Sequence, residues 1–107
     1  MTNSRVKGAA GERELANILK ENGYDARRGQ QYSGANGDAD VVGLPGIHIE
    51  CKRVESLNMN NAMIQAREDA RGNELPCVFH RKNRDVWQVN MDLDDWLILY
   101  KAWEVNH

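Results

Sequence analysis

The segment 38–53, with the sequence DADVVGLPGIHIECKR, restricts the possible folds more than any other part of the chain. Val41 and Val42 begin a short β-prone run, Pro45-Gly46 supplies a turn, and residues 47–52 alternate between apolar and polar along a second strand. Side chains two positions apart on a strand share a face, about 6.7 Å from each other. The apolar face of the second strand is therefore formed by Ile47, Ile49 and Cys51. The polar face is formed by His48, Glu50 and Lys52.

Two carboxylates meet at one end of this hairpin. Paired strands lie about 5 Å apart, so Asp40 at the start of the first strand approaches Glu50 near the end of the second. Carboxylates held close together repel each other, and a cation relieves the repulsion. Oxygen ligands of this kind suit Mg²⁺ or Mn²⁺, and Lys52 would then face a metal-bound water or a substrate phosphate. The alternative is an ordinary hairpin with solvated charges, because short motifs also match by chance.

Two neighbours of the carboxylate pair have less defined roles. Asp38 has the same parity as Asp40, so it could assist that residue or replace it as a ligand. Asp40 is preferred because it directly precedes the apolar run. His48 lies on the face of Glu50 but further along the strand, a position typical of a polar surface residue rather than a ligand.

The pattern Asp-(x)n-Glu-x-Lys across a hairpin resembles the signature of the PD-(D/E)xK nucleases. Asp40, Glu50 and Lys52 stand in the matching positions, and Ala39 replaces the proline of the motif. The segment 7–15, KGAAGEREL, resembles the first helix of the archaeal Hjc-type Holliday junction resolvases and their phage relatives. The resemblance implies an α/β protein with a restriction-endonuclease-like core. That core is a mixed central β-sheet flanked by helices, in the order α-β-β-β-α-β-β-α.

The same resemblance implies an endonuclease that hydrolyses DNA phosphodiesters with Mg²⁺ or Mn²⁺. The implied metal ligands are the side chains of Glu12, Asp40 and Glu50 and the backbone carbonyl of Cys51. Lys52 would orient or deprotonate the attacking water, or offset the negative charge that develops on the phosphate. These four side chains and one carbonyl are the expected catalytic centre.

The expected substrate is branched DNA, above all the four-way junction, because the two active sites of a twofold dimer would match its paired strands. The alternative within the same fold is a nuclease that cuts flaps or nicks, or one linked to DNA replication. The alternative from another class is a non-catalytic DNA-binding or dimerisation module. Intact Asp40, Glu50 and Lys52 favour an enzyme.

Several polar residues outside the hairpin are expected to contact DNA. Some lie on the first two predicted helices, some in or beside the glycine-rich segment 29–37, and some in the most basic short segment, 81–84. The alternatives are solvated helix charges, a plain connector and a charged hairpin tip. The candidates are Arg13, Arg27, Arg28, Gln30, Ser33, Gln65, Arg81 and Lys82.

Caps and periodicity predict the remaining elements. Helices are expected over 4–22, where Gly23 ends the first, over 58–71, and over 93–103 with Asp92 as the cap. Strands are expected over 24–28, 75–81 and 86–89. Gly8 and Gly11 cost the first helix about 1 kcal/mol each relative to alanine, which indicates a close approach of another group.

The last predicted helix contains WLILY at 96–100, five apolar residues in a row. A helix that is apolar on more than one face is buried on several sides. In so short a chain the sheet can cover one side, and a partner is needed for the other. This pattern favours a homodimer.

Composition fits one soluble domain over residues 1–107, acting in a reducing cytoplasm, including the host cytoplasm for a phage protein. Cys51 and Cys77 lack metal-site spacing and are expected to be buried thiols. No apolar run reaches the roughly 18 residues of a membrane span. The formal net charge is −2, but residues 1–90 carry 13 Lys or Arg against 12 Asp or Glu. DNA affinity must therefore come from local basic clusters and should fall with salt.

Overall fold

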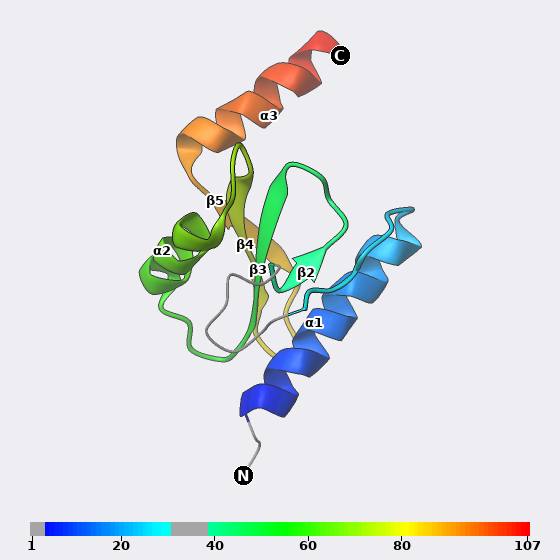
Figure 1. Ribbon diagram of the computed structural model, residues 1–107, viewed down its shortest axis with the longest axis vertical. Helices are drawn as coiled ribbons and strands as arrows, with labels where there is room; N and C mark the ends of the chain where they lie inside the picture. The colour runs from blue at the N-terminus through cyan, green and yellow to red at the C-terminus, as the bar shows by residue number, and fades with distance from the viewer. Residues whose placement is uncertain (1–3, 31–38) are drawn as a thin grey trace.

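A computed structural model describes residues 4–30 and 39–107, and over these ranges it contains three helices and five strands (Figure 1). Their order is the expected α-β-β-β-α-β-β-α. The elements are α1 (Ser4–Glu21), β1 (Arg27–Arg28), β2 (Val41–Val42), β3 (Ile47–Arg53), α2 (Met59–Asp69), β4 (Leu75–Arg81), β5 (Gln88–Met91) and α3 (Leu93–Val105). Within these ranges no helix is both long and apolar enough to cross a membrane.

The strands form one mixed sheet in the order β1-β2-β3-β4-β5. β3 and β4 are parallel and are joined through α2, whereas the other neighbouring pairs are antiparallel. Helices α1 and α2 lie on opposite sides of this sheet (Figure 1). The arrangement confirms the α/β fold class and agrees with a restriction-endonuclease-like core, whose central strand is β3.

The apolar face of β3 packs against α1, as the alternation of its residues predicts. Ile49 and Cys51 lie in one buried cluster with Leu15 and Ala16 of α1. Gly11 permits the close approach, since a Cβ at this position would lie 2.9 Å from the Cβ of Arg53. The expectation of a close neighbour is confirmed for Gly11, while a Cβ on Gly8 would meet none of the described residues within 4 Å.

α1 ends at its predicted signal, whereas α2 begins at a side-chain cap that was not predicted and ends at Asp69, two residues earlier than expected. Gly23 has φ 95° and ends α1, while the N–H of Tyr24 donates to the carbonyl of Leu19 in a Schellman-type closure. The side chain of Asn58 accepts a hydrogen bond from the N–H of Asn61 and caps α2. The thin apolar stripe of α2 then packs against Val78 of β4. Its buried members are Ala62, Met63 and Ala66.

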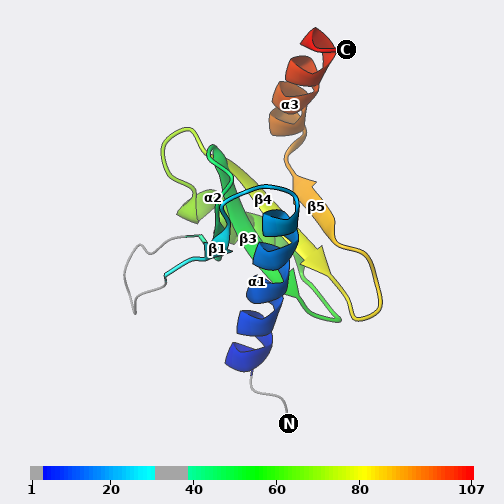
Figure 2. The ribbon, with the colours of Figure 1, turned by 90° about the vertical axis from the view of Figure 1, so that its right-hand side faces the viewer.

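Helix α3 departs from the prediction. It buries none of its side chains against the part of the chain that the structure describes, although the sheet was expected to cover one side. Figure 2 shows α3 projecting from the end of β5, away from the sheet and from α1 and α2. The molecule therefore measures 49 × 32 × 27 Å. α3 begins at Leu93 with Asp92 at its N-cap, as predicted, but the Asp92 carboxylate makes no capping hydrogen bond, because it accepts two from Arg67 over 3.0 and 2.7 Å.

The smaller differences concern strand boundaries. β1 spans two residues instead of five, and β5 begins two residues later than predicted, at Gln88. Arg84 adopts φ 60° in the turn before β5, so the chain reaches the sheet later than the apolar pattern indicated. Cys51 and Cys77 are free and buried, as expected.

The two glycines of α1 provide a matched test of this packing. Gly11→Ala is expected to lower the free energy of unfolding by about 1–3 kcal/mol, because the packed α1–β3 pair must shift. Gly8→Ala should raise it by up to about 1 kcal/mol, because the position is open and alanine has the higher helix propensity. Urea unfolding followed by circular dichroism measures both. Equal effects would show that α1 does not approach Arg53 this closely.

Candidate active site and metal centre

The polar face of β3 carries three side chains in a row. Glu50 is in the middle, with its Oε1 3.9 Å from Nζ of Lys52 and its Oε2 3.8 Å from Nε2 of His48. β3 lies between β2 and β4 in the sheet, and Glu50 is only 6 % exposed. The central strand thus holds a carboxylate away from solvent with a nitrogen group on each side.

Asp40 lies immediately before β2 and is also buried, with 9 % of its surface exposed. Its N–H donates to the carbonyl of Ile49 over 3.1 Å, and its Oδ2 accepts a hydrogen bond of 2.8 Å from the N–H of Cys51. The two contacts hold Asp40 against β3 on either side of Glu50. The predicted approach of these two carboxylates is present in the structure.

The proximity of Asp40 and Glu50 changes the pKa of Asp40 and of the neighbouring Cys51. Burial, followed by the negative charge of Glu50, raises the pKa of Asp40 to about 7, although the hydrogen bond from Cys51 acts in the opposite direction. Glu12 of α1 adds a smaller contribution of the same sign as Glu50. Burial followed by these acids also raises the pKa of the Cys51 thiol, which is therefore neutral.

The residues present fit a divalent cation. The negative charge of the buried Glu50 raises the proton affinity of Asp40, and a cation with oxygen ligands relieves that repulsion. The half-exposed ammonium of Lys52 is 3.9 Å from Glu50, too far for a hydrogen bond that would neutralise the pair. Asp40 and Glu50 could hold such an ion, whereas Glu12 does not complete a three-ligand group with them among the described residues.

One protein-family model, described as "Phage putative PDDEXK endonuclease", matches residues 3–106. The chain belongs to this family. Searches of curated proteins and of solved structures gave no match. Membership makes the chain a PD-(D/E)xK nuclease with DNA as its substrate class, and enzymes of this kind typically use a divalent metal. The resemblance to the Hjc-type junction resolvases is not confirmed by this comparison and stays a prediction.

His48 of this PD-(D/E)xK chain is not the surface residue that its position suggested. It is 3 % exposed, and its Nδ1 lies 3.9 Å from Oε1 of Glu74. Glu50 is the main cause of the raised pKa of His48. The prediction was wrong because α2 packs on the same side of the sheet and covers this part of β3. The Ala and Met stripe of α2 was the signal that could have indicated the burial.

The predicted DNA contacts of the nuclease are distributed around α1, β1 and α2. Nε of Arg28 forms an ion pair of 3.0 Å with Oε1 of Glu12, so the structure brings these two candidates together. Nε2 of Gln65 donates to Oδ2 of Asp69 over 2.7 Å. Arg28 and Gln65 are exposed, and so are Arg13, Arg27, Gln30 and Lys82. Ser33 and Asp38 lie outside the described residues.

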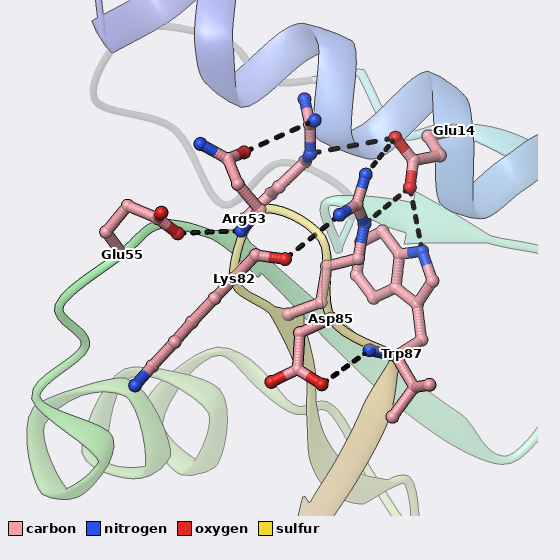
Figure 3. A network of polar contacts seen from close by, with 9 residues as sticks. Glu14, Arg53, Glu55, Lys82, Asp85 and Trp87 are labelled. Atoms are coloured by element: carbon pink, nitrogen blue, oxygen red, sulfur yellow. Dashed lines mark hydrogen bonds and ion pairs between the residues drawn. The ribbon is translucent and has the colours of Figure 1, made fainter.

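Arg81 is part of a structural network that the sequence did not reveal (Figure 3). Nε and Nη2 of Arg81 donate to the two oxygens of Glu14 over 2.7 and 3.0 Å, and the indole of Trp87 donates to Oε1 over 2.9 Å. The hydrogen bond from Arg81 is the main cause of the lowered pKa of Glu14. Glu14 thereby holds α1 against the β4–β5 turn, two residues beyond Glu12. A DNA contact by Arg81 stays a prediction.

Asp40→Asn should stabilise the metal-free nuclease at alkaline pH. Below pH 4 the carboxyl is protonated in both states, but between about 4 and 7 the unfolded chain releases this proton and the folded chain retains it. The stability contributed by the protonated group is therefore lost as pH rises towards 7. At pH 8 the variant should be more stable than the wild type by at least about 1 kcal/mol, and near pH 4 the two should match. Thermal unfolding in chelator at both pH values measures the difference.

Asp25→Asn, at an exposed position, controls for the loss of one negative charge. It should change stability little at either pH. Adding Mg²⁺ should stabilise the wild type and narrow its gap to Asp40→Asn. If the difference in stability between the wild type and Asp40→Asn is the same at pH 4 and pH 8, the pKa of Asp40 is not raised and the repulsion from Glu50 is refuted.

Proposed function

We propose that the protein is a divalent-metal-dependent endodeoxyribonuclease that resolves four-way DNA junctions as a homodimer. The observation that carries the proposal is the row formed by Asp40, Glu50 and Lys52: two buried, mutually repelling carboxylates beside one ammonium group. Family membership supplies the reaction class, and this geometry supplies the groups that the reaction needs.

The side chains divide the work of phosphodiester hydrolysis. Glu12, Asp40 and Glu50, with the carbonyl of Cys51, would hold Mg²⁺ or Mn²⁺. Such an ion, when bound, would lower the pKa of a water molecule and offset negative charge in the transition state. Lys52 orients or deprotonates the attacking water, whose oxygen bonds to phosphorus while the bond to the 3′-oxygen breaks. Products with 5′-phosphate and 3′-hydroxyl ends result.

The short contacts around the site keep these groups in position. The N–H of Cys51 donates to Oδ2 of Asp40 over 2.8 Å, and Nε of Arg28 lies 3.0 Å from Oε1 of Glu12 and orients it. A charge-assisted hydrogen bond of this kind is worth about 1.5–3 kcal/mol when it is buried, and less where it is exposed. The ligands are therefore partly organised before an ion binds.

Recognition of the junction would depend on backbone contacts and branched shape rather than base edges. The proposed contacts are Arg13, Arg27, Arg28, Gln30, Ser33, Gln65, Arg81 and Lys82. Arg27 and Arg28 are exposed on β1, at the edge of the sheet next to β2, and this location beside the carboxylate pair supports them most directly. Flapped or nicked DNA is the alternative substrate.

The exposed surface of α3 supports the homodimer. Trp96, Tyr100 and Trp103 stack along one side of the helix, with ring centroids 5.2 and 5.8 Å apart. Ile98 and Leu99 are also more than 40 % exposed. A soluble monomer rarely exposes an apolar surface of this kind, whereas the interfaces of homodimers are rich in aromatic and aliphatic side chains. A second copy of α3 has the matching surface.

Loss of the charge of Glu50 or of Lys52 should remove most of the cleavage activity. Glu50→Gln and Lys52→Ala should each reduce the Mg²⁺-dependent cleavage rate by on the order of 100-fold or more, because each group acts on the metal-bound water or the phosphate. The measurement is a time course on labelled four-way junctions, flaps, nicked and linear duplexes. Glu68→Gln, at an exposed position on α2, is the matched control and should cleave normally.

The pattern of products separates the candidate substrates. Paired nicks placed symmetrically across a junction support resolution, whereas preferred cleavage of flaps or nicks supports the alternative. Cleavage that survives both substitutions would refute the site, and DNA binding without cleavage by the wild type would favour a non-catalytic module.

The aromatic row of α3 should determine the oligomeric state. The wild type is expected to sediment as a dimer at micromolar concentration, and the double substitution Trp96→Glu with Trp103→Glu should make it a monomer, because charges would be buried at the interface. Lys101→Glu changes an exposed polar position of the same helix and should stay dimeric. A wild-type monomer in sedimentation equilibrium would remove the homodimer.

A further inference from the structure

A second group of possible metal ligands lies on the far side of Glu50 from Lys52. The ligand atoms of His48, Glu50 and Asp69 all lie within 4.8 Å of one another. Ligands about 2.1 Å from one ion are at most about 4.2 Å apart, so these side chains need to close by only about half an ångström. His48 and Glu50 come from β3, and Asp69 comes from the last position of α2.

His48 provides the independent sign that a ligand belongs here. The side chain is almost fully buried, and its Nε2, directed towards Glu50, has no hydrogen-bond partner among the residues that the structure describes. A buried polar atom without a partner costs about 1–3 kcal/mol. A metal ion between His48 and Glu50 would provide that missing partner.

The surrounding contacts resemble those that orient metal ligands elsewhere. Nδ1 of His48 faces Oε1 of Glu74, which is itself held by a 2.9 Å hydrogen bond from the N–H of Arg71. At 3.9 Å Glu74 is too far from Nδ1 for a hydrogen bond, but its negative charge favours a proton on that nitrogen, which leaves Nε2 to bind a metal ion. Gln65 donates to Oδ2 of Asp69 over 2.7 Å and restrains the third ligand in the same way.

Two of the three possible ligands, His48 and Asp69, also border a pocket. A pocket of about 220 Å³ is bordered by Val41, His48, Asp69, Arg71 and Glu74, among other residues. Its volume admits an ion together with several waters, which would complete the coordination sphere. Arg71 lines the same pocket as a positive charge, so the pocket is not uniformly acidic.

We propose that His48, Glu50 and Asp69 bind a second divalent ion that accepts nitrogen as well as oxygen ligands, such as Mn²⁺ or Zn²⁺. One imidazole and two carboxylates suit these ions, whereas Mg²⁺ and Ca²⁺ prefer oxygen ligands alone. Glu50 directs one oxygen towards Lys52 and the other towards His48, so its carboxylate can serve both sites. The site adds to the proposed nuclease function and is tested without DNA.

The test is Mn²⁺ titration of the full chain, followed by electron paramagnetic resonance with spin-echo detection of coupled ¹⁴N. The wild type should bind Mn²⁺ with the nitrogen coupling of an imidazole ligand. His48→Ala should remove that coupling, and Asp69→Asn should weaken Mn²⁺ binding at this site by about 10–100-fold. Asp69 is exposed, so Asp69→Asn keeps the test valid where His48→Ala fails to fold.

Two control variants distinguish this site from other histidines and from the proposed nuclease site. His80→Asn should retain the nitrogen coupling, because His80 is on β4 and outside the group. Asp40→Asn should abolish cleavage and yet retain the coupling, so that failure of the nuclease site and failure of this site give different results. Bound Mn²⁺ without nitrogen coupling in the wild type, or binding unchanged in both His48→Ala and Asp69→Asn, would overturn the proposal.

Discussion

The burial of two carboxylates side by side is the constraint on which the rest of the structure depends. Asp40 and Glu50 are each less than a tenth exposed, and their mutual repulsion favours any rearrangement that separates or solvates them. The fold resists this rearrangement because Glu50 stands on a strand paired on both edges, and because Cys51 of that strand donates to Asp40. A site that binds a cation strongly needs its carboxylates close together before the cation arrives. Without the cation, their repulsion lowers the stability of the fold.

Contacts of Gly11 and Glu14 hold α1, which carries Glu12, in a fixed position on the sheet. Gly11 brings the helix close to Arg53 at the end of β3, and Glu14 attaches it to Arg81 at the end of β4. The two anchors are on either side of Glu12 in the sequence and set the distance of its side chain from the carboxylate pair. An exposed ion pair would contribute at most about 1 kcal/mol, but the bidentate geometry and the added bond from Trp87 make Glu14 a defined attachment point.

Local sequence patterns predicted the fold well, because the alternation in β3 and the Gly23 stop of α1 act over a few residues. They also placed Asp40 opposite Glu50, since a hairpin register follows from its turn. The burial of His48 could not be predicted in this way, because it depends on where α2 crosses the sheet. Glu14 has its partner 67 positions away at Arg81, and Arg67 takes the Asp92 carboxylate from 25 positions away, so neither contact leaves a local pattern.

The position of α3 reconciles an acidic chain with a DNA substrate. Four of the acids and one lysine fall in residues 91–107, so the negative net charge of the protein is concentrated in and beside this helix. Figure 2 shows α3 leading away from the sheet, and interactions between exposed charges fade beyond about 8–10 Å at moderate salt. The body that carries the site has more basic than acidic residues, and a bound divalent ion would add positive charge where two carboxylates now dominate. In the proposed dimer, this separation would let the apolar helix bind a second copy without bringing its acids to the phosphates.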